Sequence, residues 1–249
     1  MFIKSIRVKN LFNQYSYEYT FNELSVGFGI NGIGKTTITR MVSFLFNTKN
    51  DFKSGYWCEI PFSEFTVTFN TDDYVSVFKD NQGNITISKT IELDPKNPDS
   101  VIKRFDYTNV HIYPDEFIEE QKKLISEIWE SFFTDFGNAV TSINWEKSKS
   151  YCVFERNNEE IKMLSDGEDK LFKFVCLIVQ AMHYQKDTTI IIDEPDTHLH
   201  IAWQSKLTDL IYDYLWHEKL PHAHIILWSH SPFMAAGREE LLSEPHFVK

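Results

Sequence analysis

The stretch "GINGIGKTT" occupies residues 29–37, between the apolar run "LSVGF" and the run "ITRMVSFLF". It matches the pattern G-x-x-x-x-G-K-[ST], with Gly29, Gly34, Lys35 and Thr36 in the fixed positions. The flanking runs predict a strand before the stretch and a helix after it, which is the context that the pattern requires. The sequence therefore predicts a loop that binds the phosphates of a nucleotide.

The residue types of this loop suit phosphate oxygens. Glycines let the backbone turn its N–H groups toward the β- and γ-phosphates, and the N-terminus of the next helix adds a favourable field. We expect Lys35 to reach the terminal phosphates and Thr36 to hold Mg²⁺. A glycine-rich turn that binds nothing is the alternative. The predicted nucleotide-binding set consists of Gly29, Asn31, Gly32, Gly34, Lys35, Thr36 and Thr37.

Size and composition limit the class of protein. With 249 residues, 42% of them hydrophobic, the chain can bury a sizeable core. A net charge of −11 argues against a free-standing nucleic-acid surface, which needs clustered Lys and Arg. The three cysteines lie far apart without C-x-x-C spacing, so we predict neither disulfides nor a zinc site. The apolar runs are too short to span a bilayer, and we expect a soluble, cytoplasmic protein.

Alternating segments dominate the first half of the chain. "IKSIRVKNL" and "YSYEYTF" predict two antiparallel strands near the amino terminus. Between residues 62 and 91, three alternating segments broken by "NTDD" and "DNQGN" predict an antiparallel sheet beside the core. We expect a surface loop at 94–100 and another strand in "YTNVHIYP", residues 107–114.

The second half alternates between helical and strand patterns. Apolar residues at helical spacing predict a helix from Asp115 onward. "YCVFERNNEEIKML" predicts a hairpin that turns at Asn157 and Asn158. "LSDGEDKLFKFVCLIVQAMHY" predicts a polar turn that opens into a largely buried helix. "TTIIIDEPDTHLH" and "HIILWSHSP" each predict a buried strand that ends in polar residues.

Four short elements occur in one order: "GINGIGKTT", "LSDGE", "IIIDEPDTHLH" and "WSHSP". Together they resemble the ATPase heads of the ABC superfamily, most closely the soluble branch with SMC, RecF and overcoming-lysogeny-defect-type proteins. The resemblance covers nearly the whole chain. It implies an α/β P-loop NTPase fold with a mixed central sheet, an antiparallel β subdomain and a helical lobe. We expect one domain, 1–249, with lobe I at 1–113 and 186–249 and a helical signature lobe at 114–185.

Two carboxylates follow the hydrophobic run "III". Asp193, at the carboxyl end of a strand, can hold Mg²⁺ beside Thr36. Glu194 follows it and is placed to polarise an attacking water. The alternative is that both residues simply cap a strand and solvate a loop.

Asp196, His198 and His200 lie just downstream, and their types also suit a transition-metal site. The resemblance instead assigns this segment to a D-loop at a dimer interface and places Asp196 with the nucleotide. Relatives often carry proline after the Leu-His pair, where this chain has Ile201. That departure leaves the start of the next helix open.

The stretch "LSDGE" resembles the ABC signature Leu-Ser-Gly-Gly-Gln, with Asp166 in place of the first glycine and Glu168 in place of the glutamine. The resemblance implies that Ser165, Gly167 and Glu168 form a second phosphate-binding surface, which completes the site of a partner chain. On local sequence alone, Ser165 also fits a capping residue before a buried helix.

His230 follows the strand "IILW" and stands where the resembled heads place a switch histidine that contacts the γ-phosphate. A structural histidine at a strand end is the alternative. The glutamine of the Q-loop cannot be assigned, because Gln121, Gln14, Gln82 and Gln180 fit no better than one another.

These expectations define a function. The resemblance implies an ATPase that dimerises head-to-tail around two ATP·Mg²⁺, with Lys35, Glu194 and His230 as catalytic residues. It further implies a role in DNA maintenance or anti-phage defence with a separate effector such as a nuclease. We expect nucleic acid to be contacted through the complex with that effector, and we expect no membrane partner. Alternatives are the nucleotide-binding subunit of a membrane transporter and an ATP sensor without turnover. The short, strand-rich stretch before "LSDGE" predicts a compact head without a long coiled coil.

Overall fold

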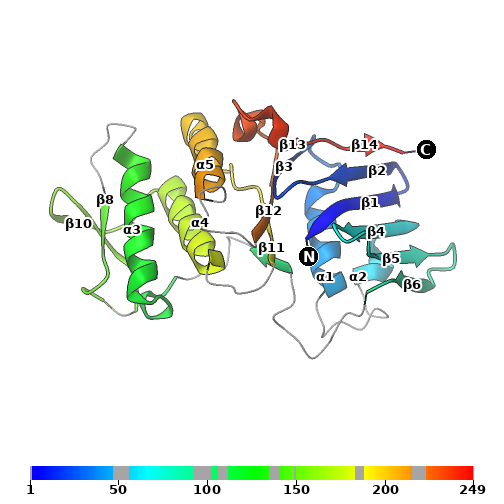
Figure 1. Ribbon diagram of the computed structural model, residues 1–249, viewed down its shortest axis with the longest axis horizontal. Coiled ribbons are helices and arrows are strands. Elements are labelled where there is room, and N and C mark those ends of the chain that lie inside the picture. Colours follow the sequence, from blue (N-terminus) through cyan, green and yellow to red (C-terminus); the bar gives the residue numbers. More distant parts are fainter. Residues whose placement is uncertain are drawn as a thin grey trace. The chain divides into compact units, whose positions relative to one another are not determined.

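The computed structural model describes residues 2–46, 56–91, 102–105, 112–134, 141–148, 150–182, 188–214 and 223–248. The chain forms two compact units, whose elements are labelled in Figure 1. The first contains Met1–Phe105, Lys186–Glu194 and His222–Lys249, and the second contains Asp106–Gln185 and Pro195–Pro221. The chain passes from the first unit to the second directly after Glu194.

An antiparallel sheet of six strands forms one layer of the first unit. In spatial order its strands are β14 (His246–Phe247), β2 (Tyr15–Thr20), β1 (Ile3–Leu11), β4 (Glu64–Phe69), β5 (Tyr74–Lys79) and β6 (Ile85–Lys89). The five strands of this sheet that were predicted between residues 3 and 91, β1, β2, β4, β5 and β6, are confirmed. They form one continuous sheet, because β1 pairs with both β2 and β4.

A second sheet of five parallel strands forms the other layer. Its order is β13 (Leu242–Ser243), β3 (Leu24–Phe28), β12 (Ala223–Ser229), β11 (Thr188–Asp193) and β7 (Ile102–Phe105). Residues Ile190, Ile191 and Ile192 are fully buried, as expected for a parallel strand covered on both faces. Strand β7 was not predicted. Most of the strand predicted at 107–114, and the loop predicted at 94–100, lie outside the described residues.

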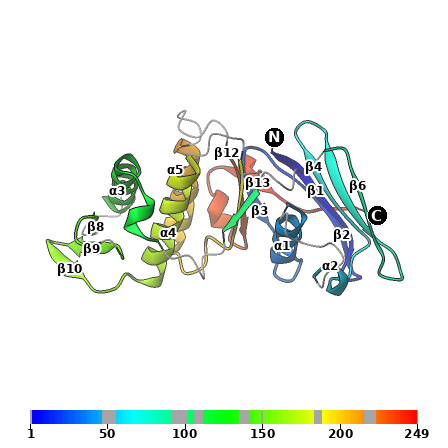
Figure 2. The ribbon, with the colours of Figure 1, turned by 90° about the horizontal axis from the view of Figure 1, so that it is seen from below.

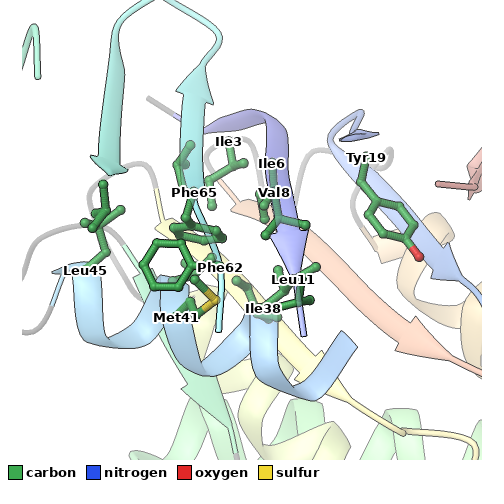
Figure 3. Close-up of a cluster of buried hydrophobic side chains, with 14 of the residues drawn as sticks. Ile3, Ile6, Val8, Leu11, Tyr19, Ile38, Met41, Leu45, Phe62 and Phe65 are labelled. Atoms are coloured by element: carbon green, nitrogen blue, oxygen red, sulfur yellow. The ribbon is translucent and has the colours of Figure 1, made fainter. Parts of the chain in front are cut away.

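Helix α1 (Lys35–Phe46) lies between these two sheets, as Figure 2 shows. Its buried side chains Ile38, Met41 and Leu45 face the apolar side of the six-stranded sheet (Figure 3). Ile191 of β11 and Trp228 of β12 belong to the same cluster of buried residues. The core of this unit therefore fixes the start of α1, which is also the end of the phosphate loop.

In its described residues, the second unit combines three α-helices with a small antiparallel sheet. Its elements are α3 (Glu119–Thr134), β8 (Thr141–Asn144), β9 (Val153–Arg156), β10 (Glu159–Ile161), α4 (Asp166–Met182) and α5 (Ile201–Tyr214). Helices α3 and α4 pack together, and the Trp129 ring lies 5.6 Å from that of Phe172 and 5.9 Å from that of Phe154. The predicted hairpin turn is confirmed, with φ of 55° and 65° at Asn157 and Asn158.

Two boundaries differ from the prediction. The helix expected from Asp115 begins at Glu119, after a 3₁₀ turn, η2 (Pro114–Glu116). The backbone N–H of Ile118 donates to Oε1 of Gln121 (2.9 Å), and this local bond fixes the helix start.

The segment 195–221, expected in lobe I, groups with the second unit. The reason is aromatic packing, because the ring of Trp203 on α5 lies 5.7 Å from Phe132 and 5.3 Å from Phe133 of α3. Helix α5 begins at Ile201, so the absence of proline there does not delay the helix.

The remaining described elements are α2 (Tyr56–Glu59), η4 (Pro232–Ala235) and η5 (Glu239–Leu241). Among the helices in the described ranges, none is both long and apolar enough to cross a bilayer.

Candidate nucleotide-binding site

The register of the parallel sheet brings three predicted motifs to one edge. Strands β3, β12 and β11 run parallel, with Gly27 opposite Trp228 and Trp228 opposite Asp193. Their carboxyl ends lead into the phosphate loop, His230 and Glu194 respectively. This edge is where open α/β sheets bind their ligands.

The phosphate loop depends on its glycines. Gly34 has a φ of 101°, and a Cβ atom on it would lie 2.6 Å from Cδ2 of Leu11. A Cβ atom on Gly29 would lie 2.8 Å from the hydroxyl of Tyr19. The Tyr17 hydroxyl donates to the carbonyl of Ile33 (2.6 Å), which ties the loop to the six-stranded sheet. The loop is thus a preformed cradle in which added side chains would collide.

Lys35 is only 5% exposed and its ammonium group points back over the loop. It donates to the carbonyl oxygens of Gly29 and Ile30 and lies 2.8 Å from Nδ1 of His230. The ammonium group that the motif predicts to bind phosphate is thus held by carbonyl oxygens of its own loop. Asn31 and Gly32 are exposed at the tip of the loop, whereas Thr36 and Thr37 lie half-buried in the first turn of α1.

His230 connects Lys35 to Glu194. Its Nε2 atom lies 3.3 Å from Oε1 of Glu194. Nδ1 of His230 also lies 3.2 Å from the carbonyl oxygen of Gly29. When Nδ1 accepts from the Lys35 ammonium, which can only donate, Nε2–H donates to the carboxylate of Glu194. Glu194 has a φ of 51°, which is uncommon for a residue with a side chain, and its N–H donates to the carbonyl of Trp228 (2.8 Å). The structure therefore brings the three predicted catalytic residues into one linked set.

Thr36 and Asp193 offer the oxygen ligands that Mg²⁺ prefers. Thr36 is the second residue of α1, and Asp193 is the last residue of β11, against which α1 packs. A hydroxyl and a carboxylate beside a glycine cradle fit an ion that also binds nucleotide phosphates.

The signature turn lies in the second unit. The Ser165 hydroxyl donates to Oε2 of Glu168 (2.8 Å), and the same carboxylate accepts the backbone N–H of Ser165 (2.9 Å). The Glu168 N–H lies 3.4 Å from Oγ of Ser165, which completes a capping box at the start of α4. A Cβ atom on Gly167 would lie 2.9 Å from the carbonyl oxygen of His198, so only glycine fits there. The capping role that local sequence left open is present.

The segment 195–200 gives no support to the metal alternative. Within the part of the chain that the structure describes, no three His, Cys, Asp or Glu residues form a group that could hold a metal ion. Asp196 and Leu199 instead offer their carbonyl oxygens to Nε2 of Gln204 on α5, at 3.4 and 3.0 Å. The side chain of Gln121 accepts the hydrogen bond from Ile118 at the start of α3. This local role does not identify it as the Q-loop glutamine, which stays unassigned.

One side chain near the loop was missed. Phe12 stands in the turn between β1 and β2 with a φ of 56° and is 39% exposed. Its Cε2 atom would lie 3.2 Å from a Cβ on Gly34, so the ring borders the loop. The sequence shows an aromatic residue in the predicted turn "NLFNQY", which could have marked Phe12 as a candidate. Its nearness to Gly34, however, depends on the fold.

The parallel sheet, the phosphate loop and the layered arrangement of the first unit give the chain a fold similar to that of SMC head domains, as the resemblance predicted. Solved structures share the fold. An SMC head domain from Thermotoga maritima has a TM-score of 0.62 and 16% identity, with full coverage of both chains. An SMC head bound to the C-terminal winged-helix domain of ScpA has a TM-score of 0.61 and 14% identity, covering 100% of this chain and 98% of that one.

Sequence comparisons point the same way. Residues 118–236 match a family model described as "AAA domain, putative AbiEii toxin, Type IV TA system". The chain is also 27% identical to the Septu protein PtuA of Bacillus thuringiensis over 303 residues of alignment. That alignment covers 97% of this chain and 75% of the relative.

Proposed function

We propose that this protein binds ATP·Mg²⁺ at the phosphate loop, hydrolyses ATP and drives an effector in anti-phage defence or DNA maintenance. The observation that carries the proposal is the linked set of Lys35, His230 and Glu194 at the carboxyl edge of the parallel sheet. The likeness to the Septu protein PtuA supports the biological role.

Each residue of this set has a distinct task. Lys35 leaves the carbonyls of its own loop and moves to the terminal phosphates, which offer a stronger, charged acceptor. Glu194 orients the attacking water and accepts its proton, while His230 donates from Nε2 to charge that develops on the γ-phosphate. Bound at Thr36 and Asp193, Mg²⁺ supplies neutralisation of phosphate charge. Phe12 provides an aromatic surface beside the loop on which the base can stack.

Two copies of the chain complete one another's sites. Ser165, Gly167 and the N-terminus of α4 in one copy cover the γ-phosphate held by Lys35 of the second copy, because a helix N-terminus favours an anion. Asp196 and its segment line the same interface. Hydrolysis removes the bridging γ-phosphate and lets the two copies separate.

Nucleic acid is reached through a partner. The basic side chains of β1 are already paired with acids, with Lys4 2.6 Å from Asp72 and Lys9 2.7 Å from Glu64. These pairs leave little positive charge on β1 for phosphate neutralisation. A separate effector, such as a nuclease, supplies the contact.

Light scattering with ATP and Mg²⁺ tests the proposal. Glu194→Gln should bind ATP normally, slow hydrolysis by about 10² to 10⁴ and accumulate as a dimer, because ATP persists in the composite site. Adding Ser165→Arg should restore the monomer by blocking the γ-phosphate. Adding Lys35→Ala should prevent ATP binding itself, whereas Lys89→Ala, at an exposed position of β6, is the matched control. A Glu194→Gln variant that stays monomeric at saturating ATP contradicts the composite site.

A further inference from the structure

The signature turn carries a negative charge where it is proposed to receive an anion. The Glu168 carboxylate accepts the Ser165 hydroxyl at 2.8 Å, so that hydroxyl is turned toward its own chain. The side chain of Glu168 is only 13% exposed, and water therefore screens its charge poorly. An arriving γ-phosphate would meet this carboxylate at the start of α4.

Arg156, the last residue of β9, supplies the opposite charge. Its Nη2 atom lies 2.7 Å from Oε1 of Glu168, and the same guanidinium donates to Oγ1 of Thr141 at 3.0 and 3.3 Å. The Thr141 bonds hold the guanidinium in place across the β8–β9 pair. The Glu168 oxygen that Arg156 contacts is the one that Ser165 does not use.

Other charged side chains near this sheet and on α4 pair with one another. Lys147 lies 2.6 Å from Glu160 and 3.6 Å from Glu155. In the first turns of α4, Asp169 pairs with Lys173 at 2.7 Å. Arg156 is thus placed to control the charge of the signature turn.

We propose that Arg156 is a positioning residue that neutralises Glu168, so that the signature turn can accept the γ-phosphate bound to a second copy. The inference rests on the proposed composite site. Two like charges brought together in a poorly screened place repel, and an arginine on the carboxylate removes that repulsion. The sheet β8–β9–β10 thereby sets the affinity of the turn for phosphate.

A double-variant cycle in the Glu194→Gln background tests this. Arg156→Met should weaken the ATP-dependent dimer by about tenfold or more, the effect of losing one charged interaction. Adding Glu168→Gln, which removes the negative charge that Arg156 no longer neutralises and keeps the shape, should restore most of that loss. Arg156→Lys should lie between, because it keeps charge without the fork of donors. Lys147→Met, in the connection between β8 and β9, should leave the dimer unchanged.

Two further measurements separate the possible failures. Circular dichroism confirms that each variant is folded at the assay temperature, and calorimetry on monomers confirms unchanged ATP binding. If Arg156→Met dimerises as tightly as its parent, the inference is wrong while the composite site stands. The same holds if Arg156→Met is folded and adding Glu168→Gln does not restore its dimer. If the Glu194→Gln parent does not dimerise, both fail together. Should Arg156→Met not fold, Arg156→Lys decides: a folded Arg156→Lys variant that dimerises as tightly as its parent would contradict the inference.

Discussion

The phosphate loop and the signature turn are both helix N-termini with a glycine and a small hydroxyl, yet they are held in different ways. The loop is fixed by residues distant in sequence, among them Leu11, Tyr17 and His230. The turn is fixed by a capping box that spans four residues, with Arg156 as a tertiary support.

The difference shows which site depends on the whole fold. Loss of packing between the sheets of the first unit disturbs the loop directly, because its glycines contact side chains from β1 and β2. The turn forms wherever α4 forms, since its hydrogen bonds are local. Variants that affect one of the two sites and spare the other test this contrast.

The largest effect is expected at Gly34. Gly34→Ala places a Cβ atom 2.6 Å from Leu11 at a φ of 101°, so both overlap and backbone strain oppose the native loop. We expect a loss of about 3 kcal/mol or more in the free energy of unfolding, together with loss of ATP binding. Gly32→Ala is the matched control, because its φ is 84° but nothing lies within 4 Å, and about 1 kcal/mol should be lost. Urea unfolding measures the stability of the two variants, and calorimetric titration measures their ATP binding. Equal losses of stability in Gly34→Ala and Gly32→Ala would show that the contact with β1 is unimportant.

Acid should weaken the first unit before the second. Burial lowers the pKa of His224 on β12 to about 4, below its ordinary value of 6.5. Between these two pKa values, His224 is protonated in the unfolded chain and neutral in the folded chain. The free energy of unfolding therefore falls as the pH drops from 6.5 toward 4, by up to about 3 kcal/mol. Hydrogen exchange should rise in β11 and β12 over this window and change less in α4. His224→Phe should flatten the response, and an unchanged acid response in that variant would contradict the assignment.

The smallest change in stability is expected at Ser165, where two substitutions separate capping from phosphate binding. Ser165→Ala removes the cap and should cost about 1 kcal/mol. Ser165→Asp restores a capping oxygen but adds negative charge, so stability should recover while the ATP-dependent dimer is lost. Thermal unfolding and light scattering on the same samples measure the two effects. A dimer that tolerates aspartate would mean that no phosphate approaches Ser165.

Local patterns made much of this protein predictable. The phosphate loop, the hairpin turn at Asn157 and Asn158, and strands β1, β2, β4, β5 and β6 were predicted from residues close in sequence, whereas β14 was not. Strand β7 was missed because "IKRF" shows no clear alternation. The start of α3 was placed four residues early, because the apolar periodicity does not mark the bond from Ile118 to Gln121.

The sequence by itself determined which residue types stand at the phosphate loop and the signature turn, and their local spacings predict the chemistry of both. Tertiary structure alone decided which groups meet. The link from Lys35 through His230 to Glu194 depends on the order of β3, β12 and β11, which bring residues up to 195 positions apart into contact. The pairing of Arg156 with Glu168 likewise depends on how β9 packs near α4. Strand order and packing arise from burying apolar surface over the whole chain, and no short stretch of sequence contains that information.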